Sequence, residues 1–154
     1  MFLILDEWIF HDLQNDNDKD KQKESFQFLE KIKEKCDKIV LIENSKFEKK
    51  LWNFSKKASK NIELKYKFKF LKYSILYNSK KIEFLNLKNM ELKNYSGILE
   101  GINSDDQYFV LSYIYLKQSG KESIIIITTD KKLKGLLEKK SISVKCRNDF
   151  IKKY

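Results

Sequence analysis

The chain has 154 residues, a net charge of +10 and a hydrophobic content of 42%. This length suits one domain with one hydrophobic core. No stretch approaches the roughly 18 to 20 consecutive apolar residues that a membrane span needs. The apolar run at residues 2–5 is too short for a signal peptide and has no basic residue before it. We therefore expect a cytoplasmic protein that does not enter a membrane.

Few side chains are available for nucleophilic or zinc chemistry. His11 is the only histidine, which leaves little for a Ser-His-Asp triad or a histidine-rich zinc site. Cys36 and Cys146 lie too far apart in the sequence for typical metal-ligand spacing, and we expect both to be reduced core thiols. If the protein is an enzyme, its carboxylates are the expected catalytic groups.

The positive charge comes almost entirely from lysine. Of the 32 basic residues, 31 are lysines, and Arg147 is the only arginine. A basic surface attracts polyanions, among which nucleic acid is the commonest. Lysine ammonium groups bind the phosphate backbone and read little sequence, so the composition favours backbone recognition.

Hydrophobic periodicity predicts strands that alternate with helices. In the middle of the chain the pattern fits a strand or a helix; we favour a helix because the pattern persists too long for one strand. Strands are predicted at 2–5, 39–42, 123–128 and 142–144, an extended piece at 81–87, and helices at 22–36, from Ser45 onward, at about 64–78, from Asp105 and Asp106 onward, at 130–139 and at 148–154. This alternation predicts one three-layer α/β/α domain over residues 1–154, with a central, mostly parallel sheet.

The polar segment at residues 15–20 has the spacing of a calcium-binding loop only in part. Asp16, Asp18 and Asp20 alternate as calcium ligands do. Lys21 stands where such a loop needs glycine, and Gln27 where it needs a bidentate glutamate. The segment is therefore predicted to be a solvated loop.

Acidic residues fall at the positions where the predicted strands end and the predicted helices begin. In a parallel sheet these positions share one rim, where sites commonly form. The acidic residues concerned are Asp6, Glu43, Glu48, Asp105, Asp106 and Asp130. Each could instead be a helix cap, and Ser45 with Glu48 has the spacing of a capping box. Taken together, they predict a cluster of carboxylates in one cleft.

Carboxylates held close together repel each other, and a hard divalent cation relieves that repulsion. Magnesium prefers oxygen ligands, and bound divalent ions can activate water for phosphodiester cleavage. The carboxylate cluster and the basic surface together predict a nuclease that uses Mg²⁺ or Mn²⁺.

Four segments carry a resemblance to the PIN-domain nucleases. Residues Leu3–Asp6 resemble the opening strand of that family with its first catalytic aspartate. Residues Asp106–Tyr113 resemble its third motif, and Ile126–Leu133 resemble a strand that ends in Thr, one residue, then Asp. The closing strand and helix of the family resemble Lys140–Val144 followed by Asp149–Ile151. The similarity extends over nearly the whole chain and keeps the order of the elements.

The resemblance implies a metal-dependent endoribonuclease, either the toxin of a toxin–antitoxin pair or an RNA-processing enzyme. It implies that Asp6, Asp106 and Asp130 hold Mg²⁺ or Mn²⁺, that Thr128 orients Asp130 or a bound water, and that a glutamate near the second helix completes the set. Glu48 fits that last position best, and Glu43 is the alternative. Asp105 is the alternative to Asp106 as a metal ligand. The implied partners are single-stranded RNA and a protein antitoxin or complex subunit.

Several points stay open at this level. Trp8 stands where the family often has a small polar residue, so it could crowd the site, stack on a base or belong to the core. A second hypothesis keeps the fold without catalysis, as an RNA-binding or scaffold subunit. A signalling receiver with an acidic pocket is a third. The sequence leaves open whether Lys65, Lys67, Lys69 and Lys72 form a binding face, and whether the aromatic-rich middle supports a homodimer.

Overall fold

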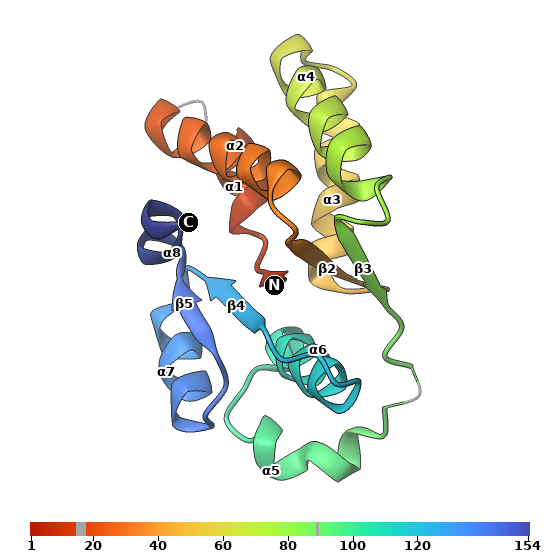
Figure 1. Cartoon of the computed structure of the whole chain (residues 1–154), viewed down its shortest axis with the longest axis vertical. Coiled ribbons are helices and arrows are strands. Elements are labelled where there is room, and N and C mark those ends of the chain that lie inside the picture. Colours follow the sequence, from red (N-terminus) through yellow and green to blue (C-terminus); the bar gives the residue numbers. More distant parts are fainter. Residues whose placement is uncertain (15–17, 89) are drawn as a thin grey trace.

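The computed structural model describes residues 1–14, 18–88 and 90–154, and these residues form one five-stranded parallel sheet covered by helices on both faces (Figure 1). The strand order is β3-β2-β1-β4-β5. The strands are β1 (Phe2–Leu5), β2 (Lys38–Ile42), β3 (Ile82–Leu85), β4 (Ile124–Thr128) and β5 (Val144–Cys146). The prediction of a three-layer α/β/α fold is confirmed, and every strand pairing is parallel.

The helices follow the predicted order, with additions. They are α1 (Trp8–Gln14), α2 (Lys19–Glu34), α3 (Lys46–Ala58), α4 (Ile62–Phe70), the π-helix η1 (Leu71–Leu76), the 3₁₀ turn η2 (Leu92–Tyr95), α5 (Ser96–Leu99), the 3₁₀ turn η3 (Ser104–Asp106), α6 (Gln107–Gln118), α7 (Lys131–Lys139) and α8 (Arg147–Lys153). Among the described residues, no helix combines the length and apolar character needed to cross a membrane.

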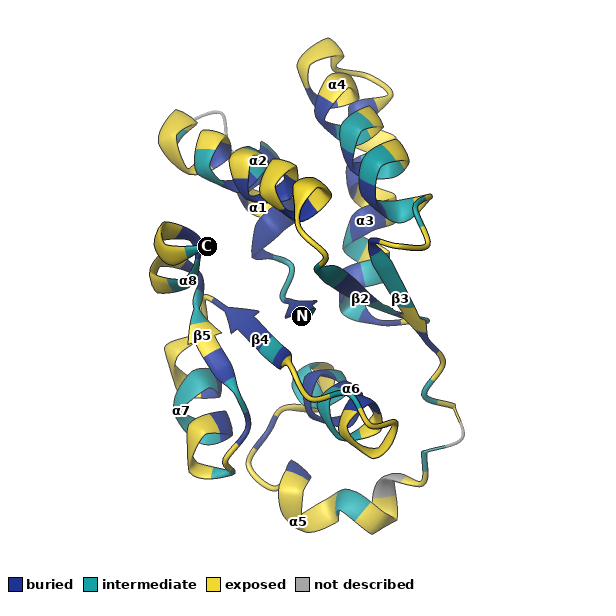
Figure 2. Cartoon of the chain, viewed as in Figure 1, coloured by how far each residue is buried: buried dark blue, intermediate teal, exposed yellow. Residues whose placement is uncertain are grey.

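Alternation along the strands divides the core into two layers. In β1, Leu3 and Leu5 belong to the cluster beneath α1, α2, α3, α4 and α8, whereas Ile4 points into the cluster beneath α5, α6 and α7. This is the period of two that sends successive side chains to opposite faces of a sheet. Strands buried on both faces must be apolar throughout, which is why the continuous runs in the sequence identify them (Figure 2).

Some predicted elements differ from the structure. Helix α1 was not expected, because its seven residues are too few to show a clear helical period. The last strand begins at Val144 instead of residue 142, since Ser141 has a positive φ of 57° and the Ile142 amide still bonds the carbonyl of Leu137 at the end of α7.

Other differences concern loops and thiols. The predicted loop at residues 15–20 lies partly outside the described residues, and α2 already begins at Lys19. Both cysteines are free, but Cys36 is exposed and Cys146 is partly buried, so the expectation of two core thiols is wrong. The helix predicted at about 64–78 is present as α4 followed without a break by η1.

The only arginine joins three helices inside the first core layer. Arg147, at the start of α8, is 3% exposed and pairs with Asp12 of α1 at 2.9 Å. Its guanidinium also donates to Glu24 at 2.7 Å and to the Ser25 hydroxyl at 2.9 Å, both in α2. A planar group with five donors can satisfy several acceptors at once, which lysine cannot do.

We expect Arg147→Met to lower the free energy of unfolding by about 3–5 kcal/mol, because Asp12 would be left buried without its counter-charge. Adding Asp12→Leu to Arg147→Met should recover part of the lost stability. Lys152→Met, which changes an exposed residue of α8, serves as control. Urea denaturation measures the free energy of unfolding of all three variants. A stability of Arg147→Met equal to that of Lys152→Met would show that the buried network is not needed.

Candidate active site

A cleft of about 540 Å³ opens where β1 and β4 end. It is lined by Asp6, Glu7, Trp8, His11, Asp12, Lys46, Asn103, Asp106, Thr129, Asp130 and Leu133. Residues far apart in the sequence meet here because β1 pairs with β4, which places Leu5 opposite Ile127. Three of the predicted carboxylates, Asp6, Asp106 and Asp130, therefore share one cleft.

Asp6 leaves β1 directly and is held by two hydrogen bonds. The Thr128 hydroxyl donates to Asp6 Oδ2 at 2.8 Å, and the Glu7 amide donates to Asp6 Oδ1 at 2.6 Å. Burial, together with the charge of Glu7, raises the pKa of Asp6 to about 6 against the lowering effect of the Thr128 bond. Ionised Asp6 is thus fixed in position but poorly neutralised by the protein.

Thr128 links the ends of two neighbouring strands. Its hydroxyl donates to Asp6 and accepts a hydrogen bond from the Asp130 amide at 3.0 Å. The side chain of Asp130 caps α7, because its Oδ1 accepts from the amides of Lys132 and Leu133 at 2.7 and 2.9 Å. Both cap bonds use Oδ1, so Oδ2 takes no part in the cap. Thr128 therefore contacts the backbone of Asp130, the residue that the resemblance implies it orients, and it also holds the carboxylate of Asp6.

Asp106 is the N-cap residue of α6, but among the described residues its side chain caps no amide of that helix. Burial raises its pKa, Lys46 lowers it, and the charges of Asp130, Glu7 and Asp105 raise it again. The mutual influence of these acids shows that they lie in one electrostatic neighbourhood. An aspartate that is not used as a cap is available for another ligand.

Glu7 and Lys46 were missed as site residues. Glu7 Oε1 pairs with the Lys46 ammonium at 2.8 Å, and the Glu7 side chain is 12% exposed. The hydrogen bond to Glu7 raises the pKa of Lys46 despite partial burial, and the charges of Asp106 and Asp6 add to the effect. The adjacent acids Asp6 and Glu7 after a buried strand were the signal, but the short helix that turns Glu7 into the cleft was not foreseen.

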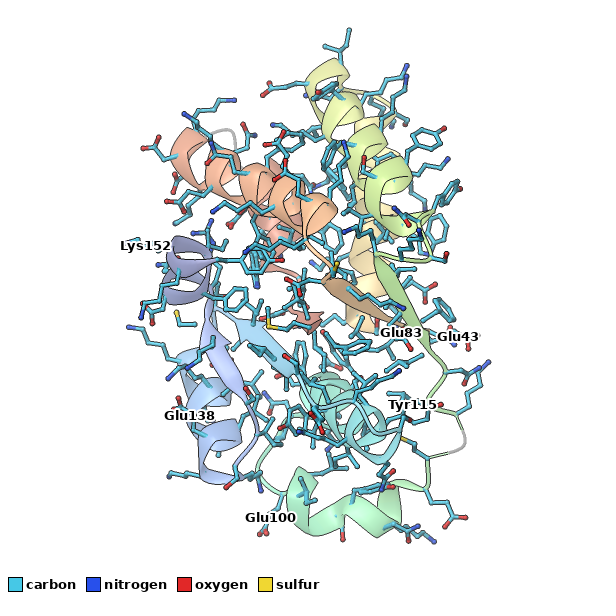
Figure 3. The ribbon with its side chains drawn as sticks, in the orientation of Figure 1. Glu43, Glu83, Glu100, Tyr115, Glu138 and Lys152 are labelled. Atoms are coloured by element: carbon cyan, nitrogen blue, oxygen red, sulfur yellow. The ribbon has the colours of Figure 1, made fainter. Side chains whose placement is uncertain are left out.

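The two glutamates proposed from sequence do not line this cleft. Glu48 completes the cap of α3: its carboxylate accepts from the Asn44 amide at 2.6 Å, and its own amide donates to the Ser45 hydroxyl at 3.1 Å. Glu43 pairs with Lys88 at 3.1 Å and points outward beside β3 (Figure 3). Asp105 is exposed and also lies outside the lining. The cap of α3 holds Glu48, and the ion pair with Lys88 holds Glu43.

Trp8 belongs to the wall of the cleft and to the core. It is 3% exposed, its indole nitrogen donates to the Ile127 carbonyl at 3.0 Å, and Arg147 lies 5.5 Å from its ring. The core alternative is thus the correct one, and a stacking role on a base is not available to a ring buried in this way. The indole instead fixes the end of β4 against α1.

The donor set of the cleft fits a hard divalent cation. Glu7 Oε2 is buried and has no hydrogen-bond partner among the described residues, and the same holds for the Tyr108 hydroxyl. Burial, with the charges of Asp6, Glu7 and Asp106, raises the pKa of Tyr108, so its phenol stays protonated. In the part of the chain that is described, no three acidic, histidine or cysteine side chains converge closely enough to form a finished metal site.

We expect a pH dependence of stability that depends on Asp6. Its pKa is raised from 3.8 to about 6, so its stabilising contribution is complete below pH 3.8 and is lost as pH rises through about 6. Between pH 4 and pH 7, Asp6→Asn should gain roughly 1–3 kcal/mol in unfolding free energy relative to the wild type, at about 1.4 kcal/mol per pKa unit.

Urea denaturation in EDTA at several pH values measures this difference. Asp105→Asn, which removes an exposed acid next to the cleft, is the matched control and should not show the gain. A constant difference between Asp6→Asn and the wild type across this range would contradict the raised pKa.

Comparison of the chain with protein-family models gives no match, and comparison with curated proteins gives none either. The PIN-domain resemblance therefore stays a prediction from the quoted motifs. Function has to be inferred from the geometry and chemistry of the cleft.

Proposed function

We propose that the protein is a metal-dependent endoribonuclease that hydrolyses RNA phosphodiesters. The observation that carries this proposal is the meeting of Asp6, Glu7, Asp106 and Asp130 in one cleft at the carboxyl end of a parallel sheet. The raised pKa values of Asp6 and Asp106, and Glu7 Oε2 without a hydrogen-bond partner among the described residues, are the features of an acidic cluster that lacks its counter-ion. In this function the protein would serve as a toxin or in RNA processing.

Each residue has a definable task. Asp6, Glu7 and Asp106, together with Oδ2 of Asp130, would hold Mg²⁺ or Mn²⁺. The bound cation would supply Lewis-acid polarisation and lower the pKa of a coordinated water. Thr128 keeps Asp6 in one orientation through the 2.8 Å bond.

Lys46 supplies a positive charge at the rim of an otherwise acidic cleft. Its ammonium lies against Glu7, and its side chain is 42% exposed. A phosphate group that approaches four carboxylates is repelled, and a lysine at the rim reduces that repulsion. Lys131 and Lys132, exposed at the start of α7 beside Asp130, would act in the same way. The cleft could thus accept a polyanionic strand.

We expect cleavage of a mixed single-stranded RNA pool in Mn²⁺ that disappears in EDTA and in Asp130→Asn. Glu7→Gln should lower the rate by at least about 100-fold, because a ligand in the cleft is lost. Glu48→Gln should leave the rate within about threefold and the protein folded, because Glu48 only caps α3 and a glutamine can still accept the hydrogen bond from the Asn44 amide.

Gel analysis of the products under single-turnover conditions makes this comparison, with thermal unfolding to show that each variant is folded. Loss of activity in Glu48→Gln with full activity in Glu7→Gln would reverse the assignment. Cleavage that persists in EDTA would overturn the metal-dependent mechanism.

The ion pair of Lys46 favours a second candidate, a metal-free subunit that binds RNA without cutting it. Lys46 already supplies a cation to Glu7, as a permanent counter-ion would. In that case a divalent cation would have no vacant place in the cleft. The two candidates differ in their response to Mn²⁺.

For the nuclease, we expect Mn²⁺ at 100 times its dissociation constant to raise the unfolding free energy by about 2.7 kcal/mol. Lys46→Gln should tighten Mn²⁺ binding, because the ammonium no longer competes for Glu7. Calorimetric titration and thermal unfolding measure both effects, with Lys49→Gln, an exposed lysine of the same helix, as control. A wild type that Mn²⁺ does not stabilise would support the metal-free subunit.

A further inference from the structure

The net charge of the protein is carried by one segment. Residues 46–81 contain 12 lysines and two glutamates, a net charge of +10, while the rest of the chain holds 20 basic and 20 acidic residues. This segment includes α3, α4 and η1, which form a helical hairpin that projects beyond the sheet (Figure 1). A field of one sign over one projecting element attracts a ligand of the opposite sign.

The same hairpin carries most of the large aromatic side chains that the fold leaves exposed. Trp52, Tyr66, Tyr73 and Tyr77 are between 59% and 70% exposed. Burying these rings in the core would have been favourable, so their exposure on a charged hairpin is informative. Figure 2 shows exposed positions along α4, interrupted by buried and intermediate ones.

A groove of about 230 Å³ runs between α3 and the continuous helix of α4 and η1. Lys65, Lys69, Lys72 and Tyr73 line it from one side, and the hydroxyls of Ser55 and Ser59 lie on the other. Among the described residues, these three lysines form no ion pair. Lys67 differs, because it is buried and pairs with Glu63 at 3.2 Å. The groove therefore presents three lysines that no acidic group of the described chain neutralises.

Tyr73, which lines the groove, and Tyr77, one helical turn further along the chain, are arranged around one lysine. The rings of Tyr73 and Tyr77 lie 5.8 Å apart, nearly perpendicular at 88°. The Lys72 ammonium lies 5.3 Å from the first ring and 5.0 Å from the second. In the π-helix η1, the Tyr77 amide bonds the Lys72 carbonyl, five residues earlier, which fixes this stretch of backbone. Charged and stacking groups thus alternate along one helical face.

We propose that this groove binds single-stranded RNA, with Lys65, Lys69 and Lys72 on phosphates and with Tyr73 and Tyr77 stacked on unpaired bases. Aromatic rings interleaved with cations are how proteins bind single strands without reading sequence. An acidic polypeptide would use the lysines and has no need of the exposed rings, and a duplex would keep its bases away from them. The groove is separate from the acidic cleft, so this binding does not depend on whether the cleft cuts RNA.

The groove lies at the opposite end of helix α3 from the acidic cleft. Lys46, at the start of α3, lines the acidic cleft, and Ser55 and Ser59, at the end of the helix, line the groove. A helix of 13 residues spans about 20 Å. The groove would therefore hold a strand at a fixed distance from the carboxylates and raise its local concentration there.

The test is fluorescence anisotropy of a labelled 12-nucleotide oligouridylate with the full-length protein in EDTA, where metal-dependent cleavage is off. The triple variant Lys65→Gln, Lys69→Gln, Lys72→Gln should bind at least about tenfold more weakly, and its slope of log affinity against log salt should fall by about 2. The matched control, Lys145→Gln, Lys152→Gln, Lys153→Gln, removes the same charge from β5 and α8 and should lose less than about threefold.

The aromatic part of the proposal has its own variants. Tyr73→Leu and Tyr77→Leu should each weaken binding by about fivefold or more, and Tyr115→Leu, on α6, should not. A duplex of the same length and poly-L-glutamate of equal charge should both compete poorly. Binding is measured in EDTA and cleavage separately in Mn²⁺, so a loss of binding in the groove variants is distinguishable from a failure of the proposed nuclease. An equal loss of affinity in the two triple lysine variants would overturn the proposal. So would tyrosine variants that bind RNA like the wild type, together with full competition by poly-L-glutamate.

Discussion

The site depends on the parallel pairing of β1 with β4 and on the Thr128 hydroxyl at its end. The pairing places Asp6 next to Thr128, although 122 positions separate them in the sequence. Thr128 then holds the Asp6 carboxylate and the Asp130 amide at once. Asp130 is the N-cap residue of α7, which begins at Lys131, so this cap brings the Asp130 side chain to the same rim. A sheet in a different order would disperse these groups.

The protein does not supply enough positive charge to neutralise the acidic side chains of the cleft. Burial and mutual repulsion raise the pKa values of Asp6 and Asp106, and one buried oxygen of Glu7 has no hydrogen-bond partner in the part of the chain that the structure describes. Asp12, which also lines the cleft, is instead paired with Arg147 at 2.9 Å. The protein thus pairs the acid that holds its helices together and leaves the other acids of the cleft short of positive charge. Lys46 supplies part of that charge, and a divalent cation would supply more.

Charge is separated in space between two parts of the molecule. Residues 46–81, which include the hairpin of α3 and α4, carry a net charge equal to that of the whole chain, whereas the acidic cleft lies at the sheet rim. An acidic site that acts on a polyanion needs a binding surface elsewhere, because carboxylates repel phosphates. Helix α3 connects the two, since its first residue reaches the cleft and its last turn lines the groove.

The sequence by itself determined the sheet, most of its covering helices and three of the acidic residues that line the cleft. Continuous apolar runs identify strands buried on both faces, and Asp6, Asp106 and Asp130 are recognisable because they follow a strand or begin a helix. The tertiary structure decided the rest. Glu7 replaces Glu48 in the cleft because a short, weakly periodic helix turns it inward, while Glu48 is held by its own cap. Lys67 is buried beside exposed Lys65 and Lys69, since only the packing of one helix on another selects the face that meets water.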